Sequence, residues 1–352
     1  MRALRWFGRG DVRIEEITVP APGPHEVQLR VGFCGICGTD LEEYSSGPLL
    51  IPISAHPLTG AMAPLTLGHE FWGTVSAVGA DVRAFKLGDR VVPEVCLYCG
   101  ECVYCREGRY ALCQSWAAVG LHRDGGLAEF VCVSAKTCVP VPEEVGGYEA
   151  ALVEPLEVAV RAVRKAELRA GGTLVITGAG PIGLLVLQVA KSSGAGRVVV
   201  VEPREARRRL AASLGADRVV APGNGAAESQ VIAAIGEPGA DAAVECAGHT
   251  ASIQLAFQTV RKGGRIVLVG IPTEPSKLDL MPLIVGERTV IGSVQHQKQE
   301  DLAAAVELLQ TRSVDVTALI SDVIPLSGAA EALRRLSSTP SDSMKVLIDP
   351  GR

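Results

Sequence analysis

A closely spaced set of cysteines is the first group in the sequence with the means to do chemistry. Cys99, Cys102, Cys105 and Cys113 are separated by two, two and seven residues. One loop with this spacing can surround a tetrahedral ion, and four thiolates that leave no open position are typical of structural zinc. Cys96 extends the series by another two-residue step, so Cys96, Cys99, Cys102 and Cys105 form a competing set. The sequence predicts a structural zinc ion in this loop.

A second group of candidate metal ligands is spread along the chain. Cys37 lies in Gly-Ile-Cys-Gly-Thr-Asp, His69 and Glu70 lie in Gly-His-Glu, and Glu154 lies in Val-Glu-Pro. Thiolate, imidazole and carboxylate all bind zinc, but each of these residues is a weak signal by itself. Cys34 and Cys37 also have the spacing of a redox pair, although no thioredoxin-like context surrounds them.

A glycine-rich motif predicts a nucleotide site. It consists of Gly178, Ala179, Gly180, Pro181, Ile182 and Gly183. The motif lies between an apolar strand expected at 173–177 and a helix expected at 181–193. In that context the first glycine makes the turn, the second lets a pyrophosphate approach the backbone, and the third lets helix and strand pack closely.

An acidic residue should follow such a motif by about 20 positions and bind the ribose hydroxyls. Glu202 lies 19 positions after Gly183, directly after a run of valines. Its carboxylate favours NAD, because it would repel the 2′-phosphate of NADP. Four nearby arginines favour NADP more weakly, since one could offset that repulsion: Arg204, Arg207, Arg208 and Arg209.

Composition excludes several other classes of protein. The chain has 352 residues, which favours two domains, and its hydrophobic fraction of 47% is that of a globular protein. A net charge of −5 provides no basic field for nucleic acid or an anionic membrane. No signal peptide or membrane span is recognisable, so we expect a soluble cytoplasmic protein. Ten cysteines in a reducing compartment then indicate metal binding or catalysis rather than disulfides.

The elements that must position these residues change in character near residue 172. Before it, segments such as 27–31, 73–78 and 88–92 read as short strands with polar and apolar residues alternating. After it, apolar strands expected at 173–177, 198–201, 219–220, 241–245, 265–269 and 288–291 alternate with helices. This alternation predicts a parallel sheet covered on both faces. A helix at 301–309 and a strand at 345–348 are expected to return to the N-terminal domain.

Taken together, these motifs resemble the zinc-dependent medium-chain dehydrogenases over essentially the whole chain. The resemblance is strongest to the polyol branch, which includes butanediol, sorbitol and threonine dehydrogenases. The stretch 51–67 is most similar to butanediol dehydrogenase. Two positions depart from that pattern, because Glu42 and Arg161 stand where butanediol dehydrogenases have histidine.

The resemblance implies an α/β fold of two domains. A GroES-like, β-rich catalytic domain would comprise residues 1–153 and 296–352, with the structural zinc loop at about 96–113. A doubly wound Rossmann domain would comprise residues 154–295.

The resemblance also assigns roles by position. Cys37, His69 and Glu154 are expected to bind a catalytic zinc ion, with Glu70 as an adjacent carboxylate able to exchange with water. Thr39 would start a proton relay. The remaining expected contacts are Asp40, which would hold a ligand in place, and Arg207, Val269 and Gly270, which would contact the cofactor.

The resulting prediction is an NAD-dependent dehydrogenase that acts on a secondary alcohol of a diol, polyol or cyclitol. We expect two zinc ions per chain, one catalytic and one structural, and a homodimer or homotetramer. Two alternatives stay open. An amino alcohol such as threonine would place its ammonium group near Glu42 and Glu43, and a non-catalytic protein would bind zinc and nucleotide without turnover.

Overall fold

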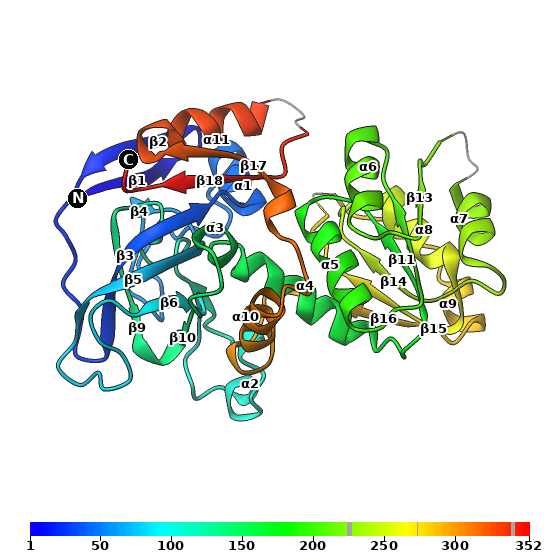
Figure 1. The fold of residues 1–352 in the computed structure, drawn as a ribbon, viewed down its shortest axis with the longest axis horizontal. Helices are drawn as coiled ribbons and strands as arrows, with labels where there is room; N and C mark the ends of the chain where they lie inside the picture. The colour runs from blue at the N-terminus through cyan, green and yellow to red at the C-terminus, as the bar shows by residue number, and fades with distance from the viewer. Residues whose placement is uncertain (224–226, 273, 339–341) are drawn as a thin grey trace. The chain divides into compact units, whose positions relative to one another are not determined.

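Strands of alternating polarity build the first part of the chain. In β3 (Glu26–Gly35), Val27, Leu29 and Val31 are buried while their neighbours are more exposed, as the period-two pattern predicts. The computed structural model describes residues 1–223, 227–272, 274–338 and 342–352. These residues form two compact units (Figure 1).

The first unit comprises Met1–Glu154, His296–Gln310 and Val316–Arg352. Its other strands are β1 (Arg2–Gly8), β2 (Asp11–Glu16), β4 (Leu65–Thr66), β5 (Glu70–Val78), β6 (Arg90–Pro93), β7 (Cys96–Leu97), β8 (Ala117–Ala118), β9 (Phe130–Ser134), β10 (Cys138–Pro140), β17 (Ile320–Pro325) and β18 (Lys345–Asp349). Its helices are α1 (Gly38–Ser46), α2 (Val103–Arg106), α3 (Gly147–Ala150), α10 (Ala303–Gln310) and α11 (Ala329–Ser338), with short turns η1 (Tyr110–Leu112), η2 (Ala135–Thr137), η3 (Lys298–Leu302), η4 (Thr317–Leu319) and η5 (Leu326–Gly328).

The main sheet of this unit joins the two ends of the chain. Its strand order is β10-β6-β5-β3-β18-β17, and β9 also pairs with β3. Strand β18 runs antiparallel to β3, with Ile348 opposite Cys34. A core that includes Leu29, Phe71 and Val346 packs beneath these strands. The C-terminal segment therefore contributes to the same layer as the N-terminal strands.

The second unit comprises Pro155–Gln295 and Thr311–Asp315. Its strands are β11 (Thr173–Thr177), β12 (Arg197–Val201), β13 (Arg218–Val220), β14 (Ala240–Glu245), β15 (Val260–Leu268) and β16 (Thr289–Gly292). Its helices are α5 (Pro181–Ser192), α6 (Glu205–Ser213), α7 (Ala227–Ile235), α8 (Thr250–Thr259) and α9 (Met281–Val285), and α4 (Val153–Ala166) begins in the first unit and continues here.

The sheet of the second unit is parallel throughout, with the order β13-β12-β11-β14-β15-β16. The strand order reverses between β11 and β14, as in doubly wound nucleotide-binding folds. Because crossover connections are right-handed, this reversal puts the helices on opposite faces. The expected fold class, a GroES-like β-rich domain with a doubly wound Rossmann domain, is confirmed.

No helix in the described part of the chain is long and apolar enough to cross a membrane. The sequence analysis did not anticipate strand β17 or helices α1, α2, α3, α4, α7, α9 and α11.

Candidate zinc and nucleotide sites

Four cysteine sulfurs meet in the loop that runs from β7 through α2 and η1. The ligand atoms of Cys99, Cys102, Cys105 and Cys113 all lie within 4.8 Å of one another. Cys99 Sγ is 3.9 Å from Cys105 Sγ and 3.5 Å from Cys113 Sγ. A zinc tetrahedron with Zn–S bonds of about 2.3 Å has sulfur–sulfur edges of about 3.8 Å. The donor set and its spacing therefore fit a zinc ion.

The protonation behaviour of this loop also suits a metal. Backbone N–H groups of Gln114 and Cys105 donate to Cys102 and lower the pKa of its thiol to about 6. Burial raises the pKa of Cys105 to about 12. Metal binds the thiolate form of cysteine. The lowered pKa of Cys102 favours that form without a metal, whereas Cys105 would become a thiolate only when a bound ion displaces its proton.

Cys96, the competing candidate for this loop, lies elsewhere. It begins β7, is 6% exposed, and its ligand atom groups within 4.8 Å with those of Glu94 and His296. The structure thus brings together the set that ends at Cys113 rather than the set that starts at Cys96.

The second cluster forms where α1 and β5 begin. Cys37 caps the N-terminus of α1, His69 directly precedes β5, and Glu70 is the first residue of β5. One ligand atom from each of these residues lies within 4.8 Å of the other two. Thiolate, imidazole and carboxylate are a donor set that suits a catalytic zinc, which needs three protein ligands and an open position.

Two glycines make room for this cluster. Gly68 has φ +97°, and a Cβ there would lie 2.7 Å from Cys34 Sγ. A Cβ at Gly35, which pairs with Glu70 across the sheet, would lie 2.3 Å from Glu70 Oε2. A side chain at Gly68 would displace the backbone that leads into His69. A side chain at Gly35 would displace the carboxylate of Glu70.

Asp40 lies behind the cluster and is fully buried. Its Oδ2 accepts the backbone N–H of Cys37 at 2.9 Å, and its Oδ1 is 3.8 Å from His69 Nδ1. In the described chain neither Oδ1 nor Nδ1 has a hydrogen-bond partner. Burial raises the pKa of Asp40, and the neighbouring His69 opposes that rise. A carboxylate on the far side of a histidine is the arrangement that orients metal-bound imidazoles.

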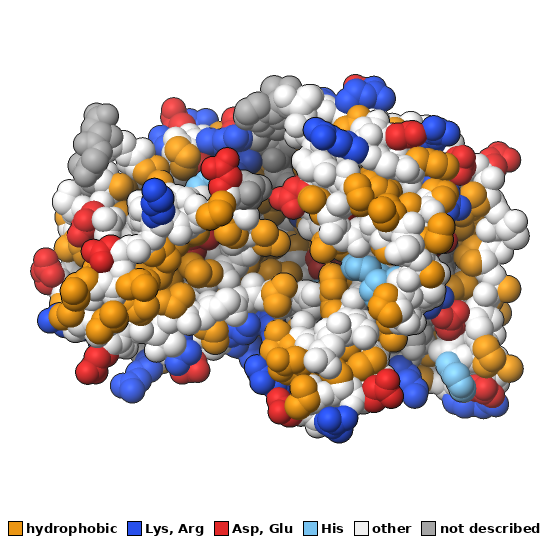
Figure 2. Space-filling view, turned by 180° about the vertical axis from the view of Figure 1, so that it is seen from behind, with side chains coloured by type: hydrophobic (Ala, Val, Ile, Leu, Met, Phe, Trp, Pro, Cys, Tyr) orange, Lys and Arg blue, Asp and Glu red, His pale blue; other side chains and the backbone are white. Residues whose placement is uncertain are grey.

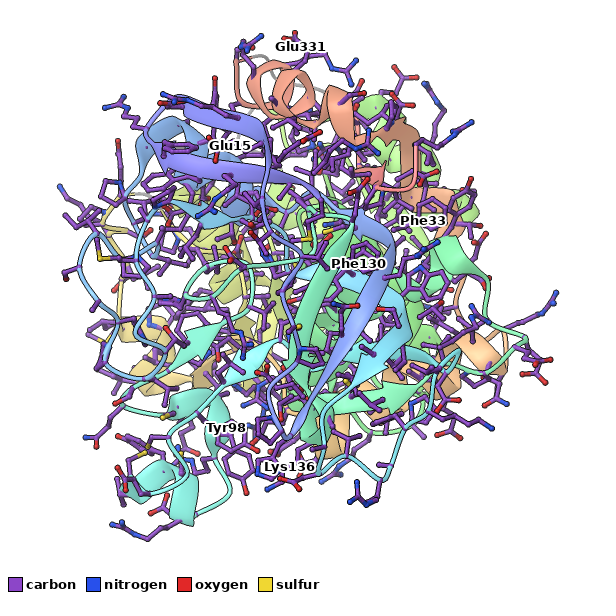
Figure 3. All side chains as sticks on the ribbon, turned by 90° about the vertical axis from the view of Figure 1, so that its left-hand side faces the viewer. Glu15, Phe33, Tyr98, Phe130, Lys136 and Glu331 are labelled. Atoms are coloured by element: carbon purple, nitrogen blue, oxygen red, sulfur yellow. The ribbon has the colours of Figure 1, made fainter. Side chains whose placement is uncertain are left out.

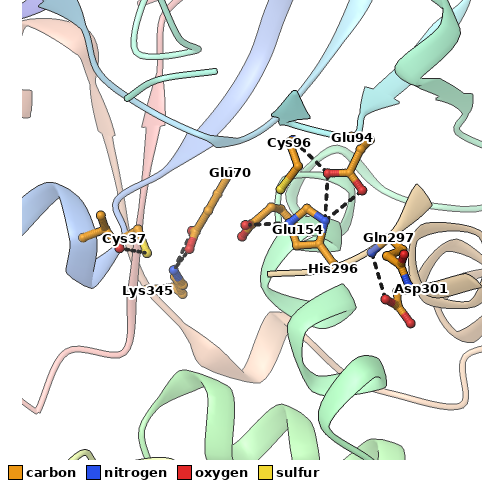
Figure 4. Close-up of polar contacts among 10 residues, drawn as sticks. Cys37, Glu70, Glu94, Cys96, Glu154, His296, Gln297, Asp301 and Lys345 are labelled. Atoms are coloured by element: carbon orange, nitrogen blue, oxygen red, sulfur yellow. Dashed lines mark hydrogen bonds and ion pairs between the residues drawn. The ribbon is translucent and has the colours of Figure 1, made fainter. Parts of the chain in front are cut away.

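Glu70 is held by a lysine that the sequence reasoning missed. Lys345, the first residue of β18, is 4% exposed, and its Nζ contacts both carboxylate oxygens of Glu70 (Figure 4). Nζ also donates to the backbone oxygen of Ile36 at 3.3 Å. Burial would lower the pKa of Lys345, but Glu70 raises it overall, so the lysine is a cation beside the cluster.

Glu154, the other carboxylate expected to bind the catalytic zinc, contacts a histidine that the sequence analysis did not single out. It lies in the first turn of α4, and its Oε1 is 3.1 Å from His296 Nε2. The carboxylate that groups with Cys37 and His69 within 4.8 Å is Glu70. Burial would raise the pKa of Glu154, but the contact with His296 outweighs it and lowers the pKa.

The remaining candidates near this cluster differ in their surroundings. Thr39 Oγ1 lies 3.8 Å from Cys37 Sγ. Glu42 is exposed on α1, and Arg161 is half-buried on α4. Glu43 is fully buried, and its carboxylate accepts backbone N–H groups of residues 49–51. The expectation that Glu43 could receive a substrate ammonium group is therefore wrong, because its oxygens hold a loop.

The glycine-rich motif of the second unit joins β11 to α5. Gly178 has φ +98°, and a Cβ at Gly183 would lie 1.9 Å from the oxygen of Gly178, so helix and turn pack too closely for any side chain. A Cβ at Gly180 would meet only Arg207 Nη1, at 3.9 Å. The space above Gly180 is where a pyrophosphate would approach the N-terminus of α5, which starts with Pro181 and Ile182.

Glu202 follows β12 and is 4% exposed. Its Oε2 accepts the N–H of Ala179 at 2.8 Å, and its Oε1 accepts the N–H of Arg204 at 2.9 Å. The carboxylate thus holds the glycine-rich turn directly.

The nearby arginines have different positions. Arg208 donates to the backbone oxygen of Glu202 at 3.0 Å, and Arg209 pairs with Glu205. Arg207 is the one whose guanidinium approaches Gly180.

Val269 and Gly270 lie at the carboxyl end of β15. Both donate their backbone N–H to the oxygen of Glu245, at 2.9 and 3.0 Å. A Cβ at Gly270 would lie 2.2 Å from the nitrogen of Gly248, so this end of the sheet is tightly packed. Ligands of doubly wound folds bind at the carboxyl ends of the strands, so the placement suits cofactor contacts.

Comparisons with known proteins agree with this geometry. Residues 23–143 match the alcohol dehydrogenase GroES-like domain, and residues 181–311 match the zinc-binding dehydrogenase model. The chain is 35% identical to (R,R)-butanediol dehydrogenase of Bacillus subtilis over 99% of this chain and 100% of that protein. A crystal structure of 2R,3R-butanediol dehydrogenase from Bacillus subtilis matches with a TM-score of 0.91 and 34% identity, covering 99% of both chains.

Two further relatives widen the comparison. Human sorbitol dehydrogenase is 33% identical over 97% of this chain and 94% of that protein. A dehydrogenase of Sinorhizobium meliloti 1021, crystallised bound to NADP, matches with a TM-score of 0.89 and 31% identity over 99% of both chains. With both domain models matched and full-length relatives above 30% identity, the chain belongs to the zinc-binding medium-chain alcohol and polyol dehydrogenase family.

Proposed function

We propose that this protein is an NAD-dependent, zinc-containing dehydrogenase that acts on a secondary alcohol of a diol, polyol or cyclitol. The observation that carries the proposal is the convergence of Cys37, His69 and Glu70 at one point of a chain similar to butanediol and sorbitol dehydrogenases. Glu154 is proposed as the third protein ligand beside Cys37 and His69, with Glu70 as the adjacent carboxylate that can exchange with water at the open position. Cys99, Cys102, Cys105 and Cys113 are proposed to hold the structural zinc ion.

When bound, the catalytic zinc supplies Lewis-acid polarisation of the substrate hydroxyl, and NAD supplies a hydride acceptor. The protein's own residues supply positioning and proton transfer. Asp40 keeps the His69 ring oriented, and the N-terminus of α5 with the bare backbone at Gly180 receives the cofactor phosphates. The Thr39 hydroxyl, close to Cys37, would relay the proton that the alcohol releases, accepting that proton while it gives its own hydroxyl proton on toward water.

We place the enzyme in the cytoplasm as a homodimer or homotetramer. All ten cysteines are described and none forms a disulfide, which suits a reducing compartment. Exposed apolar side chains gather on α9 and β16 of the second unit, and β16 is an edge strand (Figure 2). These include Met281, Ile284, Val285 and Val290. A patch of this kind on an edge strand suits a contact between subunits.

A panel of alcohols tests the proposed reaction directly. The purified enzyme should form NADH with vicinal diols, sugar alcohols or cyclitols, followed by the absorbance of NADH, and should use threonine poorly. The reason for the second expectation is that Glu43, one of the two carboxylates that favoured an ammonium group, is committed to the loop at 49–51. Turnover of threonine alone would support the amino-alcohol alternative, and no turnover of any alcohol would support a non-catalytic role.

Metal removal should separate the two zinc sites. We predict two zinc ions per chain by elemental analysis, with mild chelation abolishing activity before the protein unfolds, because the thiolate site is closed and the catalytic site is open. Cys102→Ser and Cys113→Ser should each lose one zinc and unfold at a lower temperature. Cys96→Ser is the matched control and should keep both ions. A loss of structural zinc in Cys96→Ser but not in Cys113→Ser would reverse the assignment.

Cofactor preference should depend on Glu202. We predict that NAD is preferred over NADP, and that Glu202→Ala weakens NAD binding by about 10- to 150-fold, equivalent to roughly 1.5–3 kcal/mol for hydrogen bonds to a charged group. The variant should use NADP better, because Arg207 near Gly180 could then meet the 2′-phosphate. Glu205→Ala, a neighbouring carboxylate exposed on α6, should leave both cofactors unaffected.

A preference of the native enzyme for NADP, the cofactor bound in the Sinorhizobium meliloti structure, would contradict this prediction. Such a preference would mean that the attraction of Arg207 for the 2′-phosphate is stronger than the repulsion by Glu202.

The proton transfer should depend on the hydroxyl of Thr39. Thr39→Val nearly preserves shape but removes the hydroxyl, so it should lower kcat by about 10²–10⁴-fold while zinc content and NAD binding stay unchanged. Thr39→Ser should retain most of the rate. Glu42→Gln serves as a control on the exposed side of α1 and should have a small effect. Turnover near the native rate in Thr39→Val would assign the proton to water or to Glu70 instead.

A further inference from the structure

A buried histidine connects two carboxylates at the rim of the proposed catalytic site. His296 is 2% exposed and lies in the segment that follows β16 in the chain. Its Nδ1 is 2.9 Å from Glu94 Oε1 and 3.0 Å from Glu94 Oε2, and its Nε2 is 3.1 Å from Glu154 Oε1. Figure 4 shows the three side chains in a row from Glu94 through His296 to Glu154.

The outer end of this row is fixed to the backbone. Glu94 directly follows β6 and is 3% exposed. Its Oε1 accepts the N–H of Cys96 at 2.9 Å, and its own N–H donates to the oxygen of Thr137, also at 2.9 Å. A rigid carboxylate therefore holds one nitrogen of the imidazole and sets the direction of the other.

The two carboxylates considered as ligands of the catalytic zinc, Glu70 and Glu154, are held in different ways. Lys345 Nζ engages both oxygens of Glu70. His296 engages only Oε1 of Glu154, which restrains that carboxylate at one of its two oxygens. A glutamate held at one oxygen can still offer the other to a metal, whereas one held at both by a cation must first give up part of that ion pair.

We propose that His296 is a positioning residue: held by Glu94, it orients the Glu154 carboxylate as a ligand for the catalytic zinc. This inference rests on the proposed function, because it needs a zinc ion at Cys37 and His69. Hydrogen-bonded partners behind a ligand typically change metal affinity by about 10- to 100-fold when removed.

The surroundings of His296 suit this role on the side away from Glu154. A cavity of about 310 Å³ lies against Glu94, Cys96 and His296, and its wall includes Tyr98 and Lys136 (Figure 3). The space means that a substitute side chain at position 296 can be accommodated without forcing the backbone apart.

Three substitutions at position 296 test the proposal. Gln can place its amide nitrogen near the position of Nε2 and keep the contact with Glu154, whereas Asn reaches only toward Glu94. Phe fills the volume and keeps neither contact. The readouts are the rate of zinc release to a chelator from substrate-free enzyme, and the visible spectrum after cobalt replaces the exchangeable zinc, with thermal unfolding as the check on folding.

We expect His296→Phe and His296→Asn to release the exchangeable zinc about 10- to 100-fold faster and to alter the cobalt spectrum. His296→Gln should stay within about threefold of the native rate and keep the native spectrum. The Asn and Gln pair remains decisive if the Phe variant does not fold.

Equal zinc release and an unchanged cobalt spectrum in all three variants would overturn the role of His296, even with two zinc ions bound to the native protein. Equal loss in Gln and Asn would overturn it too, because the Glu154 contact would then be irrelevant. A third zinc equivalent that disappears in Cys96→Ser would show that Glu94, Cys96 and His296 themselves bind metal. A native protein with only the structural zinc would instead refute the proposed function, and the inference with it.

Discussion

A carboxylate that is buried away from water must be compensated by hydrogen bonds or an opposite charge. This requirement determines which residues surround the proposed zinc ligands in the first unit. Asp40, Glu70 and Glu94 are 0%, 1% and 3% exposed. Asp40 has the N–H of Cys37, Glu70 has Lys345, and Glu94 has His296 together with a backbone amide. Removing one partner from such a buried pair typically costs about 3–5 kcal/mol, because the other charge is left uncompensated. The side chains in and around the proposed zinc site are thus held by the same contacts that allow acidic side chains to be buried.

The parts of the sites that could be predicted from the sequence are those whose residues are close along the chain. Cys99 and Cys113 are 14 positions apart, and the glycine-rich motif is a single turn between one strand and one helix. The partners that were missed lie far away: Lys345 is 275 positions from Glu70, and His296 is 202 positions from Glu94 and 142 from Glu154. No local pattern encodes such a pair. A lysine that starts an apolar strand was the one available hint.

Strands β11 to β14 were predicted to within a residue or two, because a buried parallel strand is apolar throughout, whereas β15 begins at Val260, ahead of the expected 265–269. Helix α7 was missed, and a π-helical turn, η3, precedes α10 where a single helix was expected. In the first unit, the contact between Lys345 and Glu70 depends on tertiary structure, because β18 pairs with β3 and thereby brings the two residues together. Glu43 is the reverse case, a residue that was expected in the site and lies elsewhere. Its position in the sequence could not distinguish a carboxylate in a pocket from one that holds a loop.

Glu202 shows how one residue can serve fold and specificity together. In the ligand-free chain its two oxygens accept the amides of Ala179 and Arg204, so the glycine-rich turn is shaped before any nucleotide arrives. A carboxylate has about four acceptor positions, so these two bonds leave room for ribose hydroxyls. The negative charge that repels a 2′-phosphate is thus also the charge that holds the turn. Changing this position alone therefore loosens the phosphate-binding backbone as well, and a second residue that holds Ala179 should add to the gain in NADP use expected of Glu202→Ala.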